Sequence, residues 1–302
     1  MDKKPIIVIA GGSGFFGSYL ANFFKEKYSV VVLTRKDAYA FTGVKYVKWD
    51  GETTGDWINS LENSEALINL SGKSINCRFS DKNKKLLLKS RIDSTKTLLA
   101  GIQELKNPPK VFLNASAGAM YVPKDVPNVE TDTIFKTDFL SKMALEWEET
   151  FFKEELPHTR RAALRISLIL GDDGGVYQVL QKLAKLYLGG HVGSGKQKMS
   201  WIYIEDAARA VEYIIKNNIK GAVNLSTENV ETNKSFMQKM RNSLGIPFGA
   251  TAPALGVKMM SRFIDIEPSL VLNSVNFIPK KLIDSGFEFK FNQLDKALEN
   301  LK

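Results

Sequence analysis

The sequence predicts an α/β protein with a doubly wound parallel sheet, and three observations support this. Residues 6–10, Ile-Ile-Val-Ile-Ala, are apolar without polar alternation, which is typical of a strand buried on both faces of a parallel sheet. A Gly-x-x-Gly-x-x-Gly run at 11–17 follows at once and leads into a helical pattern. Strand and helix patterns then alternate as far as residue 170, as they do in a doubly wound sheet.

The glycine run predicts a dinucleotide site. Gly11 permits a tight turn, Gly14 lets the main chain approach a pyrophosphate, and Gly17 lets the helix lie close to the strand. The N-terminus of the following helix offers N–H groups to phosphates, so Phe15 and Phe16 are expected beside the cofactor, with Phe16 also in the core. The alternative is a purely structural strand-to-helix turn.

The end of the second strand, residues 30–33, indicates which cofactor is bound. A protein that selects NAD usually carries Asp or Glu here, to bind the ribose 2′-hydroxyl. Thr34, Arg35 and Lys36 stand in that place. Arg35 can give forked hydrogen bonds to a 2′-phosphate and Thr34 adds a hydroxyl, so the sequence favours NADP(H) over NAD. A solvated basic turn is the alternative.

The remaining strands and helices of the predicted Rossmann-type sheet follow in order. Alternating or wholly apolar runs predict strands at 44–49, 66–70, 111–115 and 161–170. Helical spacing predicts helices at 15–27, 81–105 and 137–154, the last capped by Thr137 or Asp138.

Further cofactor-binding candidates follow from this order, because ligands bind at the carboxyl ends of the strands. Asp50 is placed to accept from the adenine amino group or, alternatively, to cap Gly51. Arg91, on the long helix, is directed at the phosphates. Three more candidates are expected to lie beneath the ribose and pyrophosphate of the cofactor: Leu70, Ser71 and Gly72.

The chain beyond residue 170 predicts a second, smaller part. A helix is expected at 176–188, an extended segment at 199–203, a helix at 204–216 and a strand at 222–226. After Pro247, prolines separate short helical pieces, with 287–289 extended. We therefore expect an NADP-binding domain at 1–170, to which about 199–226 contribute. The substrate-side part is 171–302, including an α+β module at about 247–302.

Composition limits the classes of function. The apolar runs are too short to span a bilayer, no signal peptide precedes the first strand, and Cys77 is the single cysteine, which together favour the cytoplasm. With His158 and His191 as the only histidines, no metal site is expected. The net charge of +9 comes from basic residues scattered among acids, which favours a phosphate-bearing small molecule over nucleic acid. A homodimer is left open.

Several motifs in sequence order resemble the extended short-chain dehydrogenase/reductase family. They are Gly11–Gly17, the helix with Ser90–Thr95, Leu164–Gly171 and Trp201–Asp206. The sequence is most similar to the atypical, sugar-nucleotide epimerase-like subgroup, which has its own C-terminal module. The motifs that carry the similarity to this subgroup are Ile68–Gly72, Gly193–Gly195 and Pro279–Leu282.

The resemblance implies a catalytic constellation that this chain lacks. Extended members use a Ser or Thr after the fifth strand and a Tyr-x-x-x-Lys pair on the next helix, where the Tyr is the acid/base. Here Ala117 stands at the Ser position, Phe139 at the Tyr position and Met143 at the Lys position. Tyr121 and Ser116, near the carboxyl end of the fifth strand, are the substitutes we consider.

On the substrate side, the resemblance implies that Arg78 binds an anionic group of the substrate. Trp201 is a candidate residue lining the substrate pocket. The implied function is an NADP-binding oxidoreductase or epimerase-like enzyme acting on a small polar or nucleotide-linked substrate. The alternative is a non-catalytic NADP(H)-binding sensor or scaffold, which the missing Tyr and Lys favour.

Overall fold

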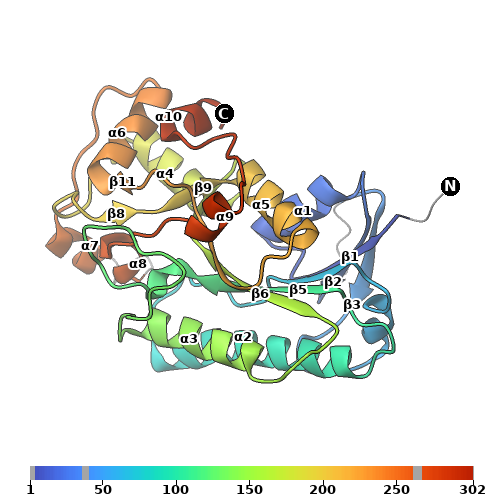
Figure 1. Ribbon diagram of the computed structural model, residues 1–302. Helices are drawn as coiled ribbons and strands as arrows, with labels where there is room; N and C mark the ends of the chain where they lie inside the picture. Colours follow the sequence, from blue (N-terminus) through green and yellow to red (C-terminus); the bar gives the residue numbers. More distant parts are fainter. Residues whose placement is uncertain (1–3, 36–40, 261–266, 302) are drawn as a thin grey trace.

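A parallel seven-stranded sheet forms the centre of the computed structural model, which describes residues 4–35, 41–260 and 267–301 (Figure 1). The strand order is β10-β6-β5-β4-β1-β2-β3, which confirms the predicted doubly wound sheet. The strands are β1 (Ile6–Ala10), β2 (Ser29–Thr34), β3 (Val44–Lys48), β4 (Ala66–Asn69), β5 (Val111–Ala117), β6 (Arg160–Ile166) and β10 (Gly221–Leu225).

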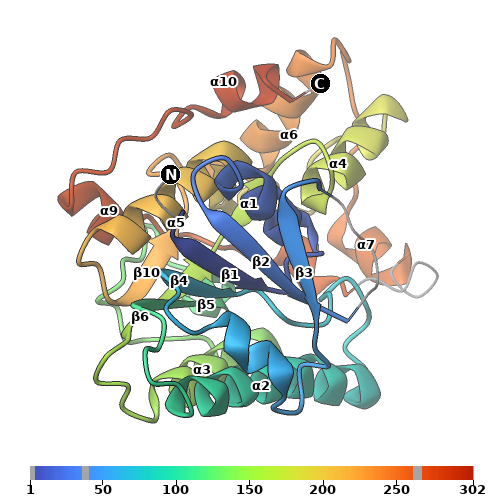
Figure 2. The same cartoon turned by 90° about the vertical axis from the view of Figure 1, so that its right-hand side faces the viewer.

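Helices cover both faces of this sheet (Figures 1 and 2). On one face lie α2 (Asp81–Gln103) and α3 (Phe139–Phe152), and on the other α1 (Phe15–Phe24) and α5 (Ile204–Lys216). Alternate residues of β1 serve the two layers: Ile7 and Ile9 pack with α1 and α5, whereas Val8 packs with α2. Burial on both sides is the reason why β1 is apolar without alternation.

Side-chain caps set the starts of α2 and α3. Ser80 accepts a hydrogen bond from the Asn83 N–H, and Asp138 accepts one from the Ser141 N–H. Each cap satisfies one of the N–H groups that a first helical turn leaves unpaired. Of the two predicted caps of α3, the structure uses Asp138.

The predicted sixth strand, 161–170, is wrong in its extent. It divides into β6 and β7 (Leu168–Leu170), and β7 pairs with β9 (Trp201–Tyr203) outside the main sheet. Ser167 marks the division, because its N–H and its hydroxyl both donate to the Leu225 carbonyl at the end of β10.

The rest of the chain builds a helical part beside the carboxyl ends of the strands. Here α4 (Gly175–Lys185), α6 (Asn233–Ser243) and α10 (Leu294–Glu299) share an apolar core that contains Trp201. Residues 287–289, predicted to be extended, belong to no strand. No helix in the described ranges is long and apolar enough to cross a membrane. The remaining elements are η1 (Asp56–Ser60), η2 (Gly118–Met120), β8 (Lys198–Met199), β11 (Glu231–Thr232), α7 (Ala254–Met260), α8 (Ser269–Leu272) and α9 (Lys280–Asp284).

Residues 275–278, which we call the C-terminal strap, connect this part to the sheet. Ser200 holds the strap through its hydroxyl, which accepts from the Phe277 N–H at 2.9 Å and donates to the Val275 carbonyl at 3.1 Å. Asn128, in the loop after β5, bonds the strap through its N–H and its carbonyl. Phe277 is fully buried beside Gly118, where a β-carbon would lie 2.1 Å from its ring. The strap is therefore part of the interior.

Candidate functional site

The glycine loop after β1 has the geometry that the sequence predicts. Gly11 has a φ of +77°, in the left-handed region that favours glycine. A β-carbon on Gly17 would lie 2.6 Å from the Gly11 carbonyl oxygen, so Gly17 allows α1 to approach the loop. The protein's own packing therefore explains both glycines.

Gly14 is different. Its φ of −84° and ψ of 169° suit any residue at the N-cap of α1, and no side chain caps this helix. A β-carbon there would meet only the Gly11 carbonyl oxygen, at 3.5 Å. The fold itself gives no reason for glycine at this exposed position, whereas a ligand approaching the N-terminus of α1 would.

The loop after β4 lies against this glycine turn. A β-carbon on Gly11 would be 2.8 Å from the Leu70 carbonyl carbon. The Asn69 amide oxygen accepts from the Ser71 N–H, and the Asn69 amide nitrogen donates to Asn114 on β5 at 2.7 Å. The buried Ser71 hydroxyl has no hydrogen-bond partner in the described structure. A fixed loop with one unpaired hydroxyl fits a polar ligand crossing this edge.

The ends of β2 and β3 form the basic side of the site. Thr34 is buried and donates to the Ser13 hydroxyl in the glycine loop at 3.4 Å, while Arg35 is exposed. Lys36 lies outside the described residues. Asp50 accepts from the N–H groups of Glu52 and Thr53 and from the Thr53 hydroxyl, and these bonds lower the pKa of its carboxyl to about 2. Asp50 thus caps the turn formed by residues 51–53, and its contact with the adenine amino group stays a prediction.

Arg91 supports the loop after β4 from α2. Its guanidinium donates to the carbonyls of Leu87 and Lys73 and lies over the Trp147 ring, 5.2 Å from the centroid. Burial lowers the pKa of Arg91 to about 10. Among the described residues no carboxylate pairs with Arg91 within 4.0 Å, and its contact with the cofactor phosphates stays a prediction.

The two phenylalanines at the start of α1 have separate roles. Phe16 is buried in the core on that face of the sheet. Phe15 is half-buried, and its ring lies among three glycines of the loop after β7. A β-carbon on any of them would come within about 3 Å of this ring: Gly171, Gly174 and Gly175. Phe15 therefore joins the glycine loop to the N-terminus of α4.

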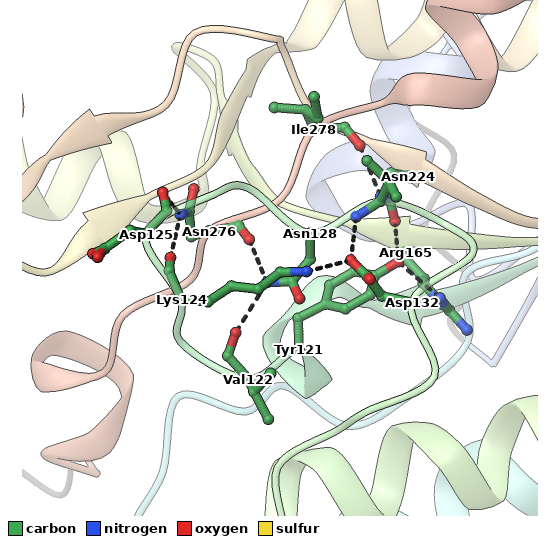
Figure 3. Close-up of polar contacts among 11 residues, drawn as sticks. Tyr121, Val122, Lys124, Asp125, Asn128, Asp132, Arg165, Asn224, Asn276 and Ile278 are labelled. Atoms are coloured by element: carbon green, nitrogen blue, oxygen red, sulfur yellow. Dashed lines mark hydrogen bonds and ion pairs between the residues drawn. The ribbon is translucent and has the colours of Figure 1, made fainter.

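Tyr121 is buried in a polar network beneath the carboxyl edge (Figure 3). Its hydroxyl donates to the Asn224 amide oxygen at 2.8 Å and accepts from the Arg165 guanidinium at 2.7 Å. Burial raises the pKa of Tyr121, while the neighbouring Arg165 acts in the opposite direction. With 1% of its surface exposed, the phenol does not reach solvent in this structure, and its role as the catalytic acid stays a prediction.

Ser116 belongs to the same network. Its hydroxyl donates to Glu148 on α3 at 2.6 Å, and Glu148 forms an ion pair with Arg165 at 2.8 Å. Burial disfavours the Arg165 charge, but Glu148 and Tyr121 outweigh it and raise its pKa. Both catalytic candidates thus have buried structural partners, and catalysis by Ser116 also stays a prediction.

The positions of the family's Tyr and Lys are apolar in space as well as in sequence. Phe139 is half-buried and Met143 is buried, and both pack in one apolar cluster with Cys77 from the loop after β4. Neither side chain can transfer a proton.

The two substrate-side candidates differ in exposure. Arg78 is exposed in the loop after β4, consistent with contact to an anionic group. Trp201 is fully buried, and its indole donates to the Asn229 carbonyl at 2.8 Å. The ring packs in the core of the C-terminal part, and a role for Trp201 in a substrate pocket stays a prediction.

Sequence reasoning missed Lys136. This lysine lies in the loop before α3, where its N–H donates to the Met120 carbonyl and its ammonium to the Ser274 carbonyl at 3.1 Å. Burial lowers its pKa. No pattern distinguishes one lysine among many, so only the fold shows that it lies between η2 and the C-terminal part.

Comparison with known sequences identifies relatives over almost the whole chain. Residues 7–226 match the model of the NAD dependent epimerase/dehydratase family, and residues 252–301 match a domain of unknown function, DUF1731. An epimerase family protein of Staphylococcus epidermidis is 33% identical over 300 residues, 97% of this chain and 98% of its own length. One from Staphylococcus aureus is also 33% identical, with the same coverage of both chains.

Solved structures give the same fold. The human epimerase family protein SDR39U1, crystallised with NADPH, has a TM-score of 0.86 and 26% identity over 98% of both chains. A UDP-N-acetylglucosamine 4-epimerase from Methanobrevibacter ruminantium, in complex with UDP-N-acetylmuramic acid, has a TM-score of 0.78 and 16% identity. That alignment covers 99% of this chain and 97% of the other.

Proposed function

Because the chain belongs to the NAD dependent epimerase/dehydratase family, we propose that it binds NADP(H) along the carboxyl edge of the sheet and acts as an oxidoreductase or epimerase-like enzyme. The substrate is a small polar or nucleotide-linked molecule, and the place of action is the cytoplasm. The NADPH in the related human structure supports the choice of cofactor.

Gly14 is the observation that carries the proposal. Neither backbone conformation nor crowding by neighbours requires glycine there, and Gly14 is itself the N-cap of α1, where no side chain caps the helix. The unpaired Ser71 hydroxyl supports a ligand at the same edge. The pyrophosphate would lie on the N–H groups of the first turn of α1, with Arg35 at the 2′-phosphate.

The nicotinamide, when bound, supplies hydride transfer at its C4 atom. The chain's own contribution is positioning and electrostatics. Arg91 fixes the loop after β4 and adds positive charge to it. Phe139 and Met143 are apolar and move no proton, so an acid must come from another residue or from the substrate.

Replacing Gly14 with Asp tests the cofactor site. Asp is a preferred N-cap residue, so Gly14→Asp should raise the free energy of unfolding by about 0.5–1 kcal/mol. The same carboxylate repels a pyrophosphate, so the dissociation constant of NADPH, measured by calorimetry, should rise at least a hundredfold.

The matched control is Gly256→Ala in α7, where a methyl group meets only Pro253 at 3.4 Å. It should leave NADPH affinity unchanged. Undiminished NADPH binding by a folded Gly14→Asp protein would overturn the proposed site.

A non-catalytic NADP(H)-binding sensor or scaffold is the second candidate function. It is favoured by apolar Phe139 and Met143 and by the buried partners of Ser116 and Tyr121. A broad screen of carbonyl compounds and sugar nucleotides, with NADPH absorbance as the readout, distinguishes the two candidate functions. Tight NADPH binding without hydride transfer to any compound would select the second candidate.

A further inference from the structure

The outer side of α4 carries exposed apolar side chains. Val179, Leu183 and Leu186 have helical spacing, so they lie on one side of the helix, and all of them are exposed. The other side of α4 packs in the core of the C-terminal part through Leu180 and Ala184. The fold itself therefore gives no reason for the outer side to be apolar.

Residues 248–259 extend this apolar surface. Phe248 stacks on Tyr187, which follows α4, with the ring centroids 4.9 Å apart. The Ala250 N–H donates to the Tyr187 carbonyl at 2.7 Å and the Gly190 N–H donates to the Ala250 carbonyl, so this segment runs beside the end of α4. Figure 2 shows α7 on the same side of the molecule as α4. The exposed apolar residues of the two segments, which we call the α4–α7 face, are Val179, Leu183, Leu186, Phe248, Leu255 and Met259.

Both segments bring positive charge to this face. Residues 174–204 and 232–264 contain basic residues but no aspartate or glutamate. On α4, Lys182 and Lys185 adjoin Leu183 and Leu186 in the chain and are exposed. Within the described ranges neither lysine pairs with a carboxylate within 4.0 Å. An apolar surface built from basic segments is complementary to a partner that is both amphipathic and anionic.

An anionic lipid bilayer has both properties. The apolar side chains of a peripheral protein enter the boundary between headgroups and acyl chains, while its lysines keep their ammonium groups among the anionic headgroups. The cytoplasmic leaflet of cell membranes carries such lipids, in agreement with the proposed place of action. A second copy bound symmetrically through the same face would instead bring like charges together, because this face would meet itself.

We propose that the α4–α7 face docks the protein on the surface of an anionic bilayer. Its apolar residues insert at the level of the headgroups, and Lys182 and Lys185 pair with lipid phosphates. A few inserted side chains or a few lysines alone bind weakly, so the two contributions act together. The inference is independent of the proposed enzymatic function, because docking needs neither cofactor nor substrate.

The first measurement is co-sedimentation of the full chain with large vesicles. Vesicles of phosphatidylcholine alone are compared with vesicles of an equal mixture of phosphatidylcholine and phosphatidylglycerol. The protein should bind the mixed vesicles at least about tenfold more tightly, because cations are attracted to an anionic surface. Raising the salt concentration from about 0.1 M to 1 M shortens the Debye length to about 3 Å and should remove most of this preference.

Leu186→Ser tests the insertion of apolar side chains, and Leu86→Ser is its control. Leu186 is 67% exposed on the α4–α7 face, and Leu86 is 41% exposed on α2, which Figure 1 shows across the main sheet from α4. Leu186→Ser should weaken binding to the mixed vesicles about tenfold, because one leucine is no longer removed from water. Leu86→Ser should change it less than about twofold, and both variants should unfold at the parent's temperature in circular dichroism.

A second pair of variants tests the charges. Lys182→Gln/Lys185→Gln removes two lysines of α4, and Lys82→Gln/Lys85→Gln removes two exposed lysines with the same spacing on α2. The α4 pair should weaken binding to the mixed vesicles about tenfold or more, and the α2 pair less than about twofold. Because both double variants lower the net charge equally, a difference between them reports where the charge lies.

Failure of the parent protein to bind the mixed vesicles would overturn the inference, as would equal losses in Leu186→Ser and Leu86→Ser. A dimer in light scattering that Leu186→Ser dissociates, without vesicle binding by the parent, would assign the face to contact between copies instead. Binding to poly-glutamate as tight as to vesicles, and unchanged in Leu186→Ser, would indicate a surface for an acidic protein and would also overturn the inference.

Discussion

The hydroxyl of Tyr121 joins two strands, because it accepts from Arg165 on β6 and donates to Asn224 on β10. Tyr121→Phe leaves both groups short of a partner inside the protein. We expect the free energy of unfolding, measured with urea, to fall by about 1–3 kcal/mol. Turnover of the true substrate should fall by two to four orders of magnitude if the phenol is also the acid.

Tyr187→Phe is the control. Tyr187 is 47% exposed and stacks on Phe248, so losing its hydroxyl should change stability by less than about 0.5 kcal/mol. A Tyr121→Phe protein as stable as this control would show that the buried bonds contribute nothing. Full turnover in Tyr121→Phe would exclude it as the acid.

Arg35 should determine cofactor choice by charge. Arg35→Asp removes the fork for the 2′-phosphate and introduces repulsion, so the dissociation constant of NADPH should rise tenfold or more. NADH, without that phosphate, should be affected much less. An equal change for both cofactors in a titration would mean that Arg35 does not contact the 2′-phosphate.

Single residues were predictable where the chemistry is local. Gly11 and Gly17 follow from a turn that allows no side chain, and the structure gives each a steric cause. The full burial of Trp201 was not predictable, because an aromatic residue in a core and one lining a pocket have the same local pattern. The partner of Ser116, Glu148, lies 32 residues away, and no sequence period connects them.

At the scale of elements, α5 is tied to the C-terminal segment by one carboxylate. Asp206 is fully buried and accepts from the N–H groups of Lys290 and Phe291, besides pairing with Arg209. Asp206→Asn replaces one acceptor with a donor, so one buried N–H loses its partner. The free energy of unfolding should fall by about 2–3 kcal/mol in a urea titration.

Glu205→Gln is the neighbouring control. Glu205 pairs with Lys290, whose side chain is 57% exposed, and such exposed pairs contribute at most about 1 kcal/mol. Losses of similar size in the two variants would contradict the assignment of Asp206 as the main link.

Helices and strands with a clear hydrophobic periodicity were predictable from the sequence. The elements that they pair with were less predictable. Helices α2 and α3 carry caps and apolar stripes, and their predicted bounds agree with the structure within a few residues. The run 161–170 is uniformly suited to a strand, yet Ser167 bonds to Leu225 and β7 pairs with β9. Pairing depends on residues distant in sequence, which a local pattern does not report.

For the whole molecule, the C-terminal strap decides whether the chain can be shortened. A chain ending at residue 246 would lack the strap and leave Asn128 and Ser200 without their buried partners. We expect that the thermal unfolding of this shortened chain, measured by circular dichroism, is no longer cooperative. We also expect it to elute as aggregates from a size-exclusion column. A soluble shortened chain that still binds NADPH would show that the sheet folds independently.

The strap also sets an order of events during synthesis. The Asn128 side chain bonds the Asn276 carbonyl across a separation of 148 residues. At translation rates of about 5–20 residues per second, roughly 7–30 s separate the appearance of these two partners. During this interval the loop after β5 has no strap to pack against, and such distant contacts are also slow to form. The protein therefore completes its fold only after nearly all of its chain has been made. Until then, the apolar surface that Phe277 finally covers is exposed and accessible to a chaperone.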